Sequence, residues 1–239
     1  MTEFRPVAVR HHGADLVGAL AVPAGSGPHP AVLVMHTAHG LSEQMRERAA
    51  RLAERGYVAL AGDMYGGGQY FAEPEQAGEP FSSLINSPDL MRARTVAWYR
   101  TLAAIPEVDA ARVAAIGFCF GGRCVLELAR SGADAKAVVS FHGLLTTSEP
   151  ALPGQVRAHV AVYTGARDPY APPQHVDAVR QEMRKAGAPC DLTVFSTAGH
   201  GFTDPDAGSM GRPGIAYDRV ADHVSWSGTL ALLDTVLTA

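Results

Sequence analysis

The feature that most constrains this chain is a regular alternation of short, continuous apolar runs with longer stretches of helical period. Because the runs are continuous rather than alternating, they predict strands that are buried on both faces, as in a parallel sheet between helices. Two further runs, 7–10 and 16–22, flank a glycine-containing turn and predict a hairpin. The predicted buried strands cover residues 31–35, 58–61, 113–117, 137–141, 160–163 and 192–195.

Segments with apolar residues at helical spacing lie between these strands. Ser87 and Pro88 predict the N-cap and the first position of one helix, while Gly56 and Gly132 close two others. Alternating strands and helices imply right-handed crossovers, so we expect an α/β fold with a mostly parallel central sheet flanked by helices on both faces. The predicted helices lie around residues 45–53, 88–102, 124–128 and 173–186, and from about residue 217 to the C-terminus.

The domain organisation follows from length and composition. The chain has 239 residues, and no repeat, linker or shift in composition divides it. We therefore expect residues 1–239 to form one domain, long enough to bury its own core. Two long stretches, 64–86 and 201–214, are predicted to be irregular. Loops of this length serve function or simply cover the surface, and the sequence leaves both interpretations open.

Charge and cysteine content exclude several classes of protein. With 24 acidic against 20 basic residues and a net charge of −4, the chain has no basic patch for nucleic acid or anionic lipid. No apolar run approaches the roughly 18 residues of a membrane span, and the N-terminus lacks the apolar region of a signal peptide. Three cysteines in a chain this long favour a reducing compartment. We expect a cytoplasmic protein without a membrane or nucleic-acid partner; its oligomeric state is not predicted.

The sharpest motif is Gly117-Phe118-Cys119-Phe120-Gly121-Gly122, which follows a predicted strand and opens a predicted helix. Small residues two before and two after Cys119 permit a sharp turn that raises its side chain above the sheet. The helix N-terminus favours a thiolate at the same position. This context predicts a nucleophile, although buried cysteines are often inert.

A thiol nucleophile requires a base, and the base requires a carboxylate that orients it. Asp168 follows the predicted strand 160–163, and His200 follows the predicted strand 192–195. The order Cys119, Asp168, His200 is the nucleophile–acid–base order of α/β-hydrolases. The plainer interpretations are a helix N-cap for Asp168 and a turn histidine for His200.

Over nearly its whole length the chain resembles the dienelactone hydrolase family of α/β-hydrolases. The resemblance rests on residues 34–41 and 62–66, the cysteine turn, Gly-x-x-Asp-Pro around Asp168 and Gly-His-Gly-Phe around His200. It implies a catalytic triad of Cys119, His200 and Asp168 that cleaves a small ester or lactone without a cofactor. The oxyanion hole would use the backbone N–H groups of Phe120 and Ala38.

Two departures from the family pattern bear on the substrate. Thr37 stands where the family usually carries a glutamate thought to interact with the thiol, so we expect an ordinary Cys119–His200 ion pair. Asp204 stands where dienelactone-cleaving members place an arginine that binds the substrate carboxylate. We therefore expect a neutral ester or lactone. Cations for an anionic substrate could instead come from Arg92, Arg94 or Arg123.

Other side chains are candidates for the pocket. We expect His36 to support the oxyanion loop and His39 to border the pocket, while His142 is either a pocket-edge or a structural residue. Cys124 and Cys190 are predicted to be packing residues. The histidines lack diagnostic metal-ligand spacing, so no metal is predicted. The predicted substrate contacts are Thr37, His36, Tyr65, Arg92 and Phe202, and the further aromatic candidates are Tyr70, Phe81, Phe120 and Trp98.

The predicted reaction is hydrolysis through a thioester on Cys119. Because a thiolate leaves more readily than an alkoxide, such an enzyme favours esters with a good leaving group, such as enol lactones. A thioesterase or acyltransferase would use the same triad and differ in the acceptor. A non-hydrolytic redox or ligand-binding protein, with Cys124 as a partner for Cys119, is the alternative from another class.

Overall fold

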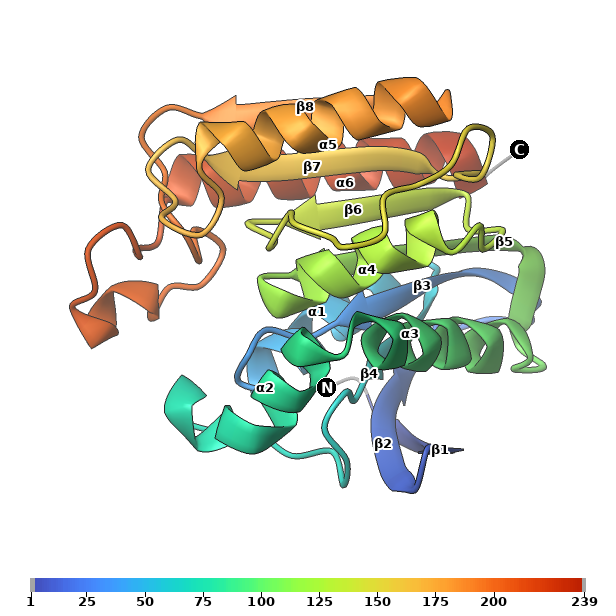
Figure 1. Cartoon of the computed structure of the whole chain (residues 1–239). Coiled ribbons are helices and arrows are strands. Elements are labelled where there is room, and N and C mark those ends of the chain that lie inside the picture. Colours follow the sequence, from blue (N-terminus) through green and yellow to red (C-terminus); the bar gives the residue numbers. More distant parts are fainter. Residues whose placement is uncertain (1–2, 238–239) are drawn as a thin grey trace.

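The computed structural model describes residues 3–237 and contains eight strands, six α-helices and two short 3₁₀ helices within them (Figure 1). None of these described helices is long and apolar enough to cross a membrane. The strands are β1 Arg5–His11, β2 Ala14–Ala21, β3 His29–Met35, β4 Val58–Gly62, β5 Val108–Phe118, β6 Ala137–Phe141, β7 His159–Gly165 and β8 Cys190–Phe195. The α-helices are α1 Glu43–Ala53, α2 Gly78–Asn86, α3 Pro88–Ala103, α4 Phe120–Arg130, α5 Pro173–Ala186 and α6 Arg219–Leu237, and the 3₁₀ helices are η1 Pro74–Ala77 and η2 Ala207–Met210.

All eight strands form one sheet in the order β1-β2-β4-β3-β5-β6-β7-β8. The β1–β2 hairpin is antiparallel and joins the sheet through an antiparallel β2–β4 pair, whereas the strands from β4 to β8 are parallel neighbours. This arrangement confirms the predicted mostly parallel α/β sheet. Because parallel strands end on the same side, the loops after β3, β4, β5, β6, β7 and β8 meet at one edge of the sheet.

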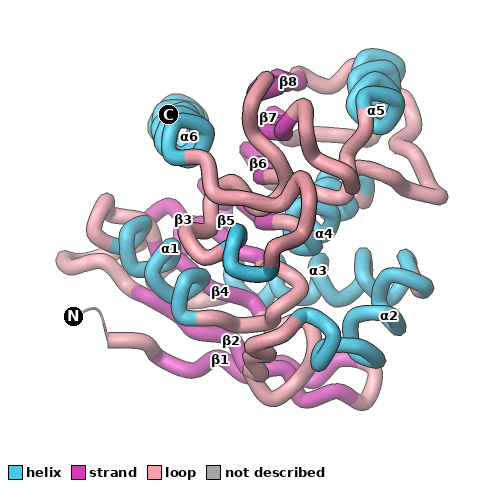
Figure 2. Tube along the Cα trace, turned by 90° about the vertical axis from the view of Figure 1, so that its left-hand side faces the viewer, coloured by secondary structure: helices cyan, strands magenta, loops and turns pink. Residues whose placement is uncertain are grey.

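Helices cover both faces of the sheet, as predicted. Helices α1 and α6 lie on one face, and α3, α4 and α5 lie on the other (Figure 2). On the first face Met45 and Trp226 pack with Val32 and Ile116. The second face holds a larger apolar core that includes Trp98. Strands buried from both sides account for the continuous apolar runs in the sequence.

Three predicted segments need correction. The stretch 64–86 is not irregular throughout, because its second half forms η1 and α2. Phe81, Leu84 and Ile85 have helical spacing and pack toward the core, a pattern that the surrounding glycine, proline and serines concealed. Strand β5 begins at Val108 rather than at residue 113. Helix α6 begins at Arg219 rather than near residue 217, and its predicted extension over 238–239 lies outside the described residues.

The predicted helix starts and stops are mostly confirmed. Ser87 and Pro88 occupy the N-cap and first positions of α3, but the Ser87 side chain makes no capping hydrogen bond.

The loop after β4 is held by a buried carboxylate. The buried Asp63 carboxylate accepts backbone N–H groups of Val17, Tyr65, Gly66 and Gly68 at 2.8–3.1 Å. Asp63 thus fixes the first residues of the long segment that leads to η1 and α2.

Candidate active site

Cys119 lies in a sharp turn between β5 and α4. Its backbone has φ of 54°, in the left-handed region, and its N–H donates to the carbonyl of Phe141 at 3.0 Å. A Cβ on Gly117 would overlap the carbonyl of Gly121, and one on Gly121 would overlap the carbonyl of Met35. The two glycines are therefore required for the close approach of strand and helix. The turn leaves the Cys119 side chain partly exposed at the carboxyl edge of the sheet.

Asp168 and His200 lie at the same edge, after β7 and β8. His200 Nδ1 and Asp168 Oδ2 are 2.9 Å apart, and the other Asp168 oxygen accepts the backbone N–H of Tyr170 at 2.8 Å. The N–H of His200 donates to the carbonyl of Gly214 at 2.7 Å. Asp168 and His200 are only 4% and 6% exposed, so little water competes with their pair. Strands β7 and β8 are neighbours in the sheet, whereas β6 separates them from β5, the strand that precedes Cys119.

The thiol and the imidazole form a mutually stabilising pair. Burial alone would raise the pKa of Cys119, but the charge and hydrogen bond of His200 outweigh it and hold that pKa below its usual value. Burial alone would lower the pKa of His200, yet the Cys119 thiolate and the hydrogen bond to Asp168 raise it to about 10. The two side chains therefore shift each other toward a thiolate beside an imidazolium.

The other two cysteines behave oppositely. Cys124 is completely buried in α4, and burial raises the pKa of its thiol far above the usual range. Burial likewise raises the pKa of Cys190 to about 11. Cys119 is therefore the one of the three described cysteines whose surroundings favour the thiolate, the reactive form of the side chain.

Two backbone N–H groups point at the same thiol. Those of Ala38 and Phe120 hydrogen bond to Cys119 and help to lower its pKa. The loop that carries Ala38 is held from below by His36, whose Nδ1 donates to the carbonyl of Thr37 at 2.6 Å. Its Nε2 accepts the N–H of Met64 at 2.9 Å, which settles the tautomer. The geometry thus brings together the two donors that the sequence predicted.

A cavity of about 400 Å³ opens over Cys119 and His200. Its wall is mostly apolar and includes Phe81 and His142, which the sequence placed among the pocket candidates. Residues from the segments 64–86 and 201–214 form the side opposite the strand ends. Both long segments therefore contribute to the site rather than merely covering the surface.

The structure does not bring the predicted arginines to this cavity. The Arg92 guanidinium pairs with Glu127 and Glu149, each at 2.6 Å, and lies over α4 away from Cys119. Arg94 is buried and donates to the carbonyl of Met64 at 2.5 Å. Arg92, Arg94 and Arg123 are all absent from the cavity wall. The expectation that Arg92 contacts substrate is corrected accordingly, because two carboxylates already engage it.

Three of the other predicted substrate contacts lie behind the wall. His36 and Phe202 are fully buried, and Tyr65 donates its hydroxyl to the carbonyl of Ala38 at 3.1 Å. These residues support the loops and do not line the cavity. Thr37 does line it, and its hydroxyl accepts the N–H of His39 at 3.3 Å. The aromatic candidates Tyr70, Phe120 and Trp98 also lie outside the cavity wall.

The sequence missed the charged rim of the cavity. Arg212 and Glu75 both line it and form an ion pair that links η1 to the segment after η2. Asp204 also lines the cavity, so these three side chains carry two negative charges and one positive charge. The only indication in the sequence was the length of the segments 64–86 and 201–214, since loops of this length often serve function. Of the three, only Asp204 had been singled out from the sequence; Glu75 and Arg212 had not, because a loop has no periodicity.

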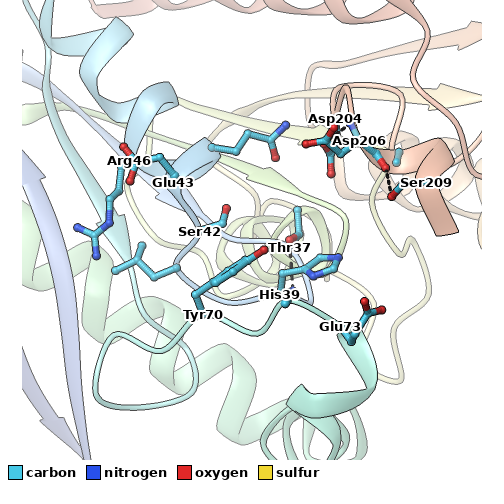
Figure 3. A pocket seen from close by; sticks show the side chains of 14 residues that line it. Thr37, His39, Ser42, Glu43, Arg46, Tyr70, Glu73, Asp204, Asp206 and Ser209 are labelled. Atoms are coloured by element: carbon cyan, nitrogen blue, oxygen red, sulfur yellow. Dashed lines mark hydrogen bonds between the residues drawn. The ribbon is translucent and has the colours of Figure 1, made fainter.

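A second, polar groove of about 720 Å³ continues from the cavity and shares Thr37, His39, Asp204 and Ala207 with it. In Figure 3 Asp204 and Asp206 lie on one side of this groove, and His39 and Tyr70 lie on the other. Within residues 3–237 no group of three His, Cys, Asp or Glu side chains is placed to hold a metal ion. The Cys119 thiol, the His200 imidazole and Ala38 all line the adjoining cavity.

Comparison with known proteins places the chain among hydrolases. The family model described as "Dienelactone hydrolase family" matches residues 16–237. The solved structure named m3DLH is 40% identical, with a TM-score of 0.92 and 99% coverage of both chains. The dienelactone hydrolase-like promiscuous phosphotriesterase P91 from metagenomic libraries is 37% identical, with a TM-score of 0.90 and 98% coverage of both chains. A candidate carboxymethylenebutenolidase of Methylorubrum extorquens is 30% identical over 76% of this chain and 66% of its own length.

Proposed function

This chain belongs to the dienelactone hydrolase family, whose members hydrolyse ester and lactone bonds, and we propose that it does so through Cys119, His200 and Asp168. It is accordingly a carboxylic ester hydrolase. The observation that carries the proposed mechanism is the position of the Cys119 thiol. It lies in a strained turn, paired with His200 and faced by the N–H groups of Ala38 and Phe120.

Acylation uses the thiolate–imidazolium pair. The Cys119 Sγ attacks the carbonyl carbon, and the carbonyl electron pair moves to the oxygen, which the N–H groups of Ala38 and Phe120 stabilise. As the tetrahedral intermediate collapses, the C–O bond breaks and His200 gives its proton to the leaving oxygen. The product is a thioester on Cys119 and a neutral His200, held in position by Asp168.

Deacylation returns the enzyme to its first state. Neutral His200 takes a proton from water while the water oxygen attacks the thioester carbonyl. Collapse of the second intermediate breaks the C–S bond, releases the acid and restores the Cys119 thiolate beside the His200 imidazolium. Asp168 keeps Nδ1 of His200 protonated in both half-reactions, so that Nε2 carries the proton transfers.

The cavity supports a small, neutral substrate. Its wall is mostly apolar, and the rim residues Glu75, Asp204 and Arg212 leave one negative charge in excess, which would repel an anion. A thiolate is a better leaving group than an ordinary alkoxide, so the substrate would carry an activated leaving group, as an enol lactone does. Because the similar protein P91 is named a promiscuous phosphotriesterase, neutral phosphotriesters are worth assaying beside the esters and lactones.

A redox role with Cys124 as the partner of Cys119 has less support. The Cys124 thiol is fully buried, and burial raises its pKa far above the usual range, so it has little thiolate with which to attack an oxidised Cys119.

The test is turnover of neutral activated esters and enol lactones by Cys119→Ala. We expect a loss of at least about a thousandfold in kcat, because the nucleophile is absent. Cys190→Ala is the matched control, since that thiol is partly exposed and lies outside the cavity. Turnover retained by Cys119→Ala, or a strong preference for anionic over neutral substrates, would count against the proposal.

A further inference from the structure

His142 follows strand β6, between the strand ends that carry Cys119 and Asp168. Its φ is 38°, and within the described residues only His12, Cys119 and His142 have positive φ without being glycine. Cys119 and His142 both line the reaction cavity. Backbone strain of this kind persists only where the surrounding structure imposes it. The sheet edge therefore holds two strained residues side by side at the site.

The orientation of the His142 ring is fixed by an anchor. Its Nε2 shares a hydrogen bond of 2.8 Å with the hydroxyl of Thr203, which is 1% exposed. The carbonyl of Thr203 accepts side-chain N–H groups of Gln44 and Arg48, each at 3.0 Å. The backbone N–H of His142 donates to the carbonyl of Tyr163 at 2.8 Å. Helix α1 thus holds Thr203, and Thr203 holds the imidazole plane.

The anchored ring lies against His200. The two imidazole centroids are 5.2 Å apart with an interplanar angle of 71°. The ring of Tyr170 meets His200 at 4.8 Å and 84°. His200 is therefore bordered by two rings that are nearly perpendicular to it, while Asp168 holds its Nδ1. These contacts restrict the directions in which the His200 ring can turn away from Cys119.

Packing alone does not explain a histidine at this position. His142 is 1% exposed, and its Nδ1 has no hydrogen-bond partner. A phenylalanine would fill a similar space beside Phe118 and Phe202 without leaving a buried nitrogen unpaired. A phenyl ring would, however, lack the bond to Thr203 that fixes the ring plane. Burial, the neighbouring charge of His200 and that of Arg48 lower the pKa of His142, so it stays neutral beside the imidazolium.

We propose that His142 is a positioning residue: anchored by the Thr203 hydroxyl, its ring holds the His200 imidazole in line between Asp168 and Cys119. The inference rests on the proposed function for the role of His200 in turnover. It extends the site to a fourth side chain, one that touches neither the substrate carbonyl nor the thiol in the mechanism above.

The test compares Thr203→Val, which removes the hydroxyl while keeping the branched shape, with Thr203→Ser, which keeps the hydroxyl. In Thr203→Val we expect kcat to fall roughly ten- to a hundredfold with little change in KM, because a misplaced His200 affects the chemical steps. Thr203→Ser should recover most of that loss. His142→Phe keeps a ring but loses the nitrogen that bonds Thr203, so its kcat should fall as much as that of Thr203→Val. If Thr203→Val does not fold, His142→Phe replaces it in the comparison.

A second readout does not depend on turnover. The pH at which iodoacetamide alkylates Cys119 at half its maximal rate, followed on the Cys119 peptide by mass spectrometry, should rise in Thr203→Val and His142→Phe. The reason is that a misplaced imidazolium stabilises the thiolate less. Wild-type kcat and alkylation profiles in both variants would overturn the proposal, as would equal losses in Thr203→Val and Thr203→Ser. If wild-type Cys119 never takes an acyl group, the proposed function fails, while the alkylation profiles still decide the role of His142.

Discussion

The two sides of the reaction cavity are built very differently. The side formed by strand ends carries Cys119, Asp168 and His200, each fixed by hydrogen bonds to backbone or to one another. The opposite side comes from η1, α2 and the segment around η2, and its Arg212–Glu75 ion pair joins two exposed side chains. From this comparison we propose that the sheet provides the catalytic groups, while the two long segments select the substrates.

The largest effects should come from the strand-end side. We expect His200→Ala to lower kcat at least as strongly as Cys119→Ala, and Asp168→Asn to lower it by roughly three to four orders of magnitude, because the amide favours the wrong His200 tautomer. Steady-state kinetics with one neutral ester would measure both. Asp204→Asn on the opposite side is the control, and an effect as large as that of Asp168→Asn would remove the distinction between the two sides.

The pH dependence should report the same fixed pair. Because the pKa of Cys119 lies below its usual value, the thiolate and hence kcat/KM should be lost on the acid side at a lower pH than for an unperturbed thiol. Because the pKa of His200 is raised to about 10, the proton donor should be lost as pH rises through that region. In Asp168→Asn the alkaline limb should move to lower pH, since the carboxylate helps to raise the His200 pKa. An alkaline limb near the ordinary histidine value would contradict the ion pair.

An intermediate effect is expected from Phe81, which lines the cavity and packs edge-on against Phe120 at 5.5 Å. Phe81→Ala should enlarge the apolar space and raise kcat/KM for a bulky acyl group relative to acetyl by roughly tenfold. The kcat for the acetyl ester should change much less. Leu152→Ala, at a side chain that is 67% exposed, is the control. An unchanged acyl preference would show that the loop side does not select substrates.

The smallest effect should come from the rim. Glu75→Gln removes the partner of Arg212 and one of the two rim carboxylates, so kcat/KM for anionic esters should rise a few-fold while that for neutral esters stays nearly constant. Glu107→Gln offers a matched control, because Glu107 pairs with Arg5 at 2.9 Å and lies outside the cavity wall. A loss with anionic esters would mean that the pair acts by ordering the rim.

The same contrast explains what could be predicted from the sequence. The strands, the turn at Cys119 and the positions of Asp168 and His200 follow from local patterns, since continuous apolar runs and paired glycines leave few alternatives. The structure brings these three side chains together at one sheet edge, and their catalytic roles remain a proposal.

The loop side resisted prediction for a physical reason. Arg212 lies in a segment without periodicity, so its place on the rim depends on how two distant loops meet. Arg92 was expected at the substrate because its charge is visible in the sequence, whereas its pairing with Glu127 and Glu149 is a tertiary contact. Likewise α2 was concealed by its glycine, proline and serines, and packing of Phe81 and Leu84 against the core accounts for its formation.

Mass spectrometry of the acyl-enzyme tests most directly whether Cys119 is the nucleophile. The protein would be mixed with a neutral activated ester, quenched in acid within the first turnovers and digested. We expect an added acyl mass on the peptide that contains Cys119, removed by further incubation and absent from Cys119→Ala. Turnover of the ester with no adduct on that peptide, or with the adduct on another residue, would contradict it.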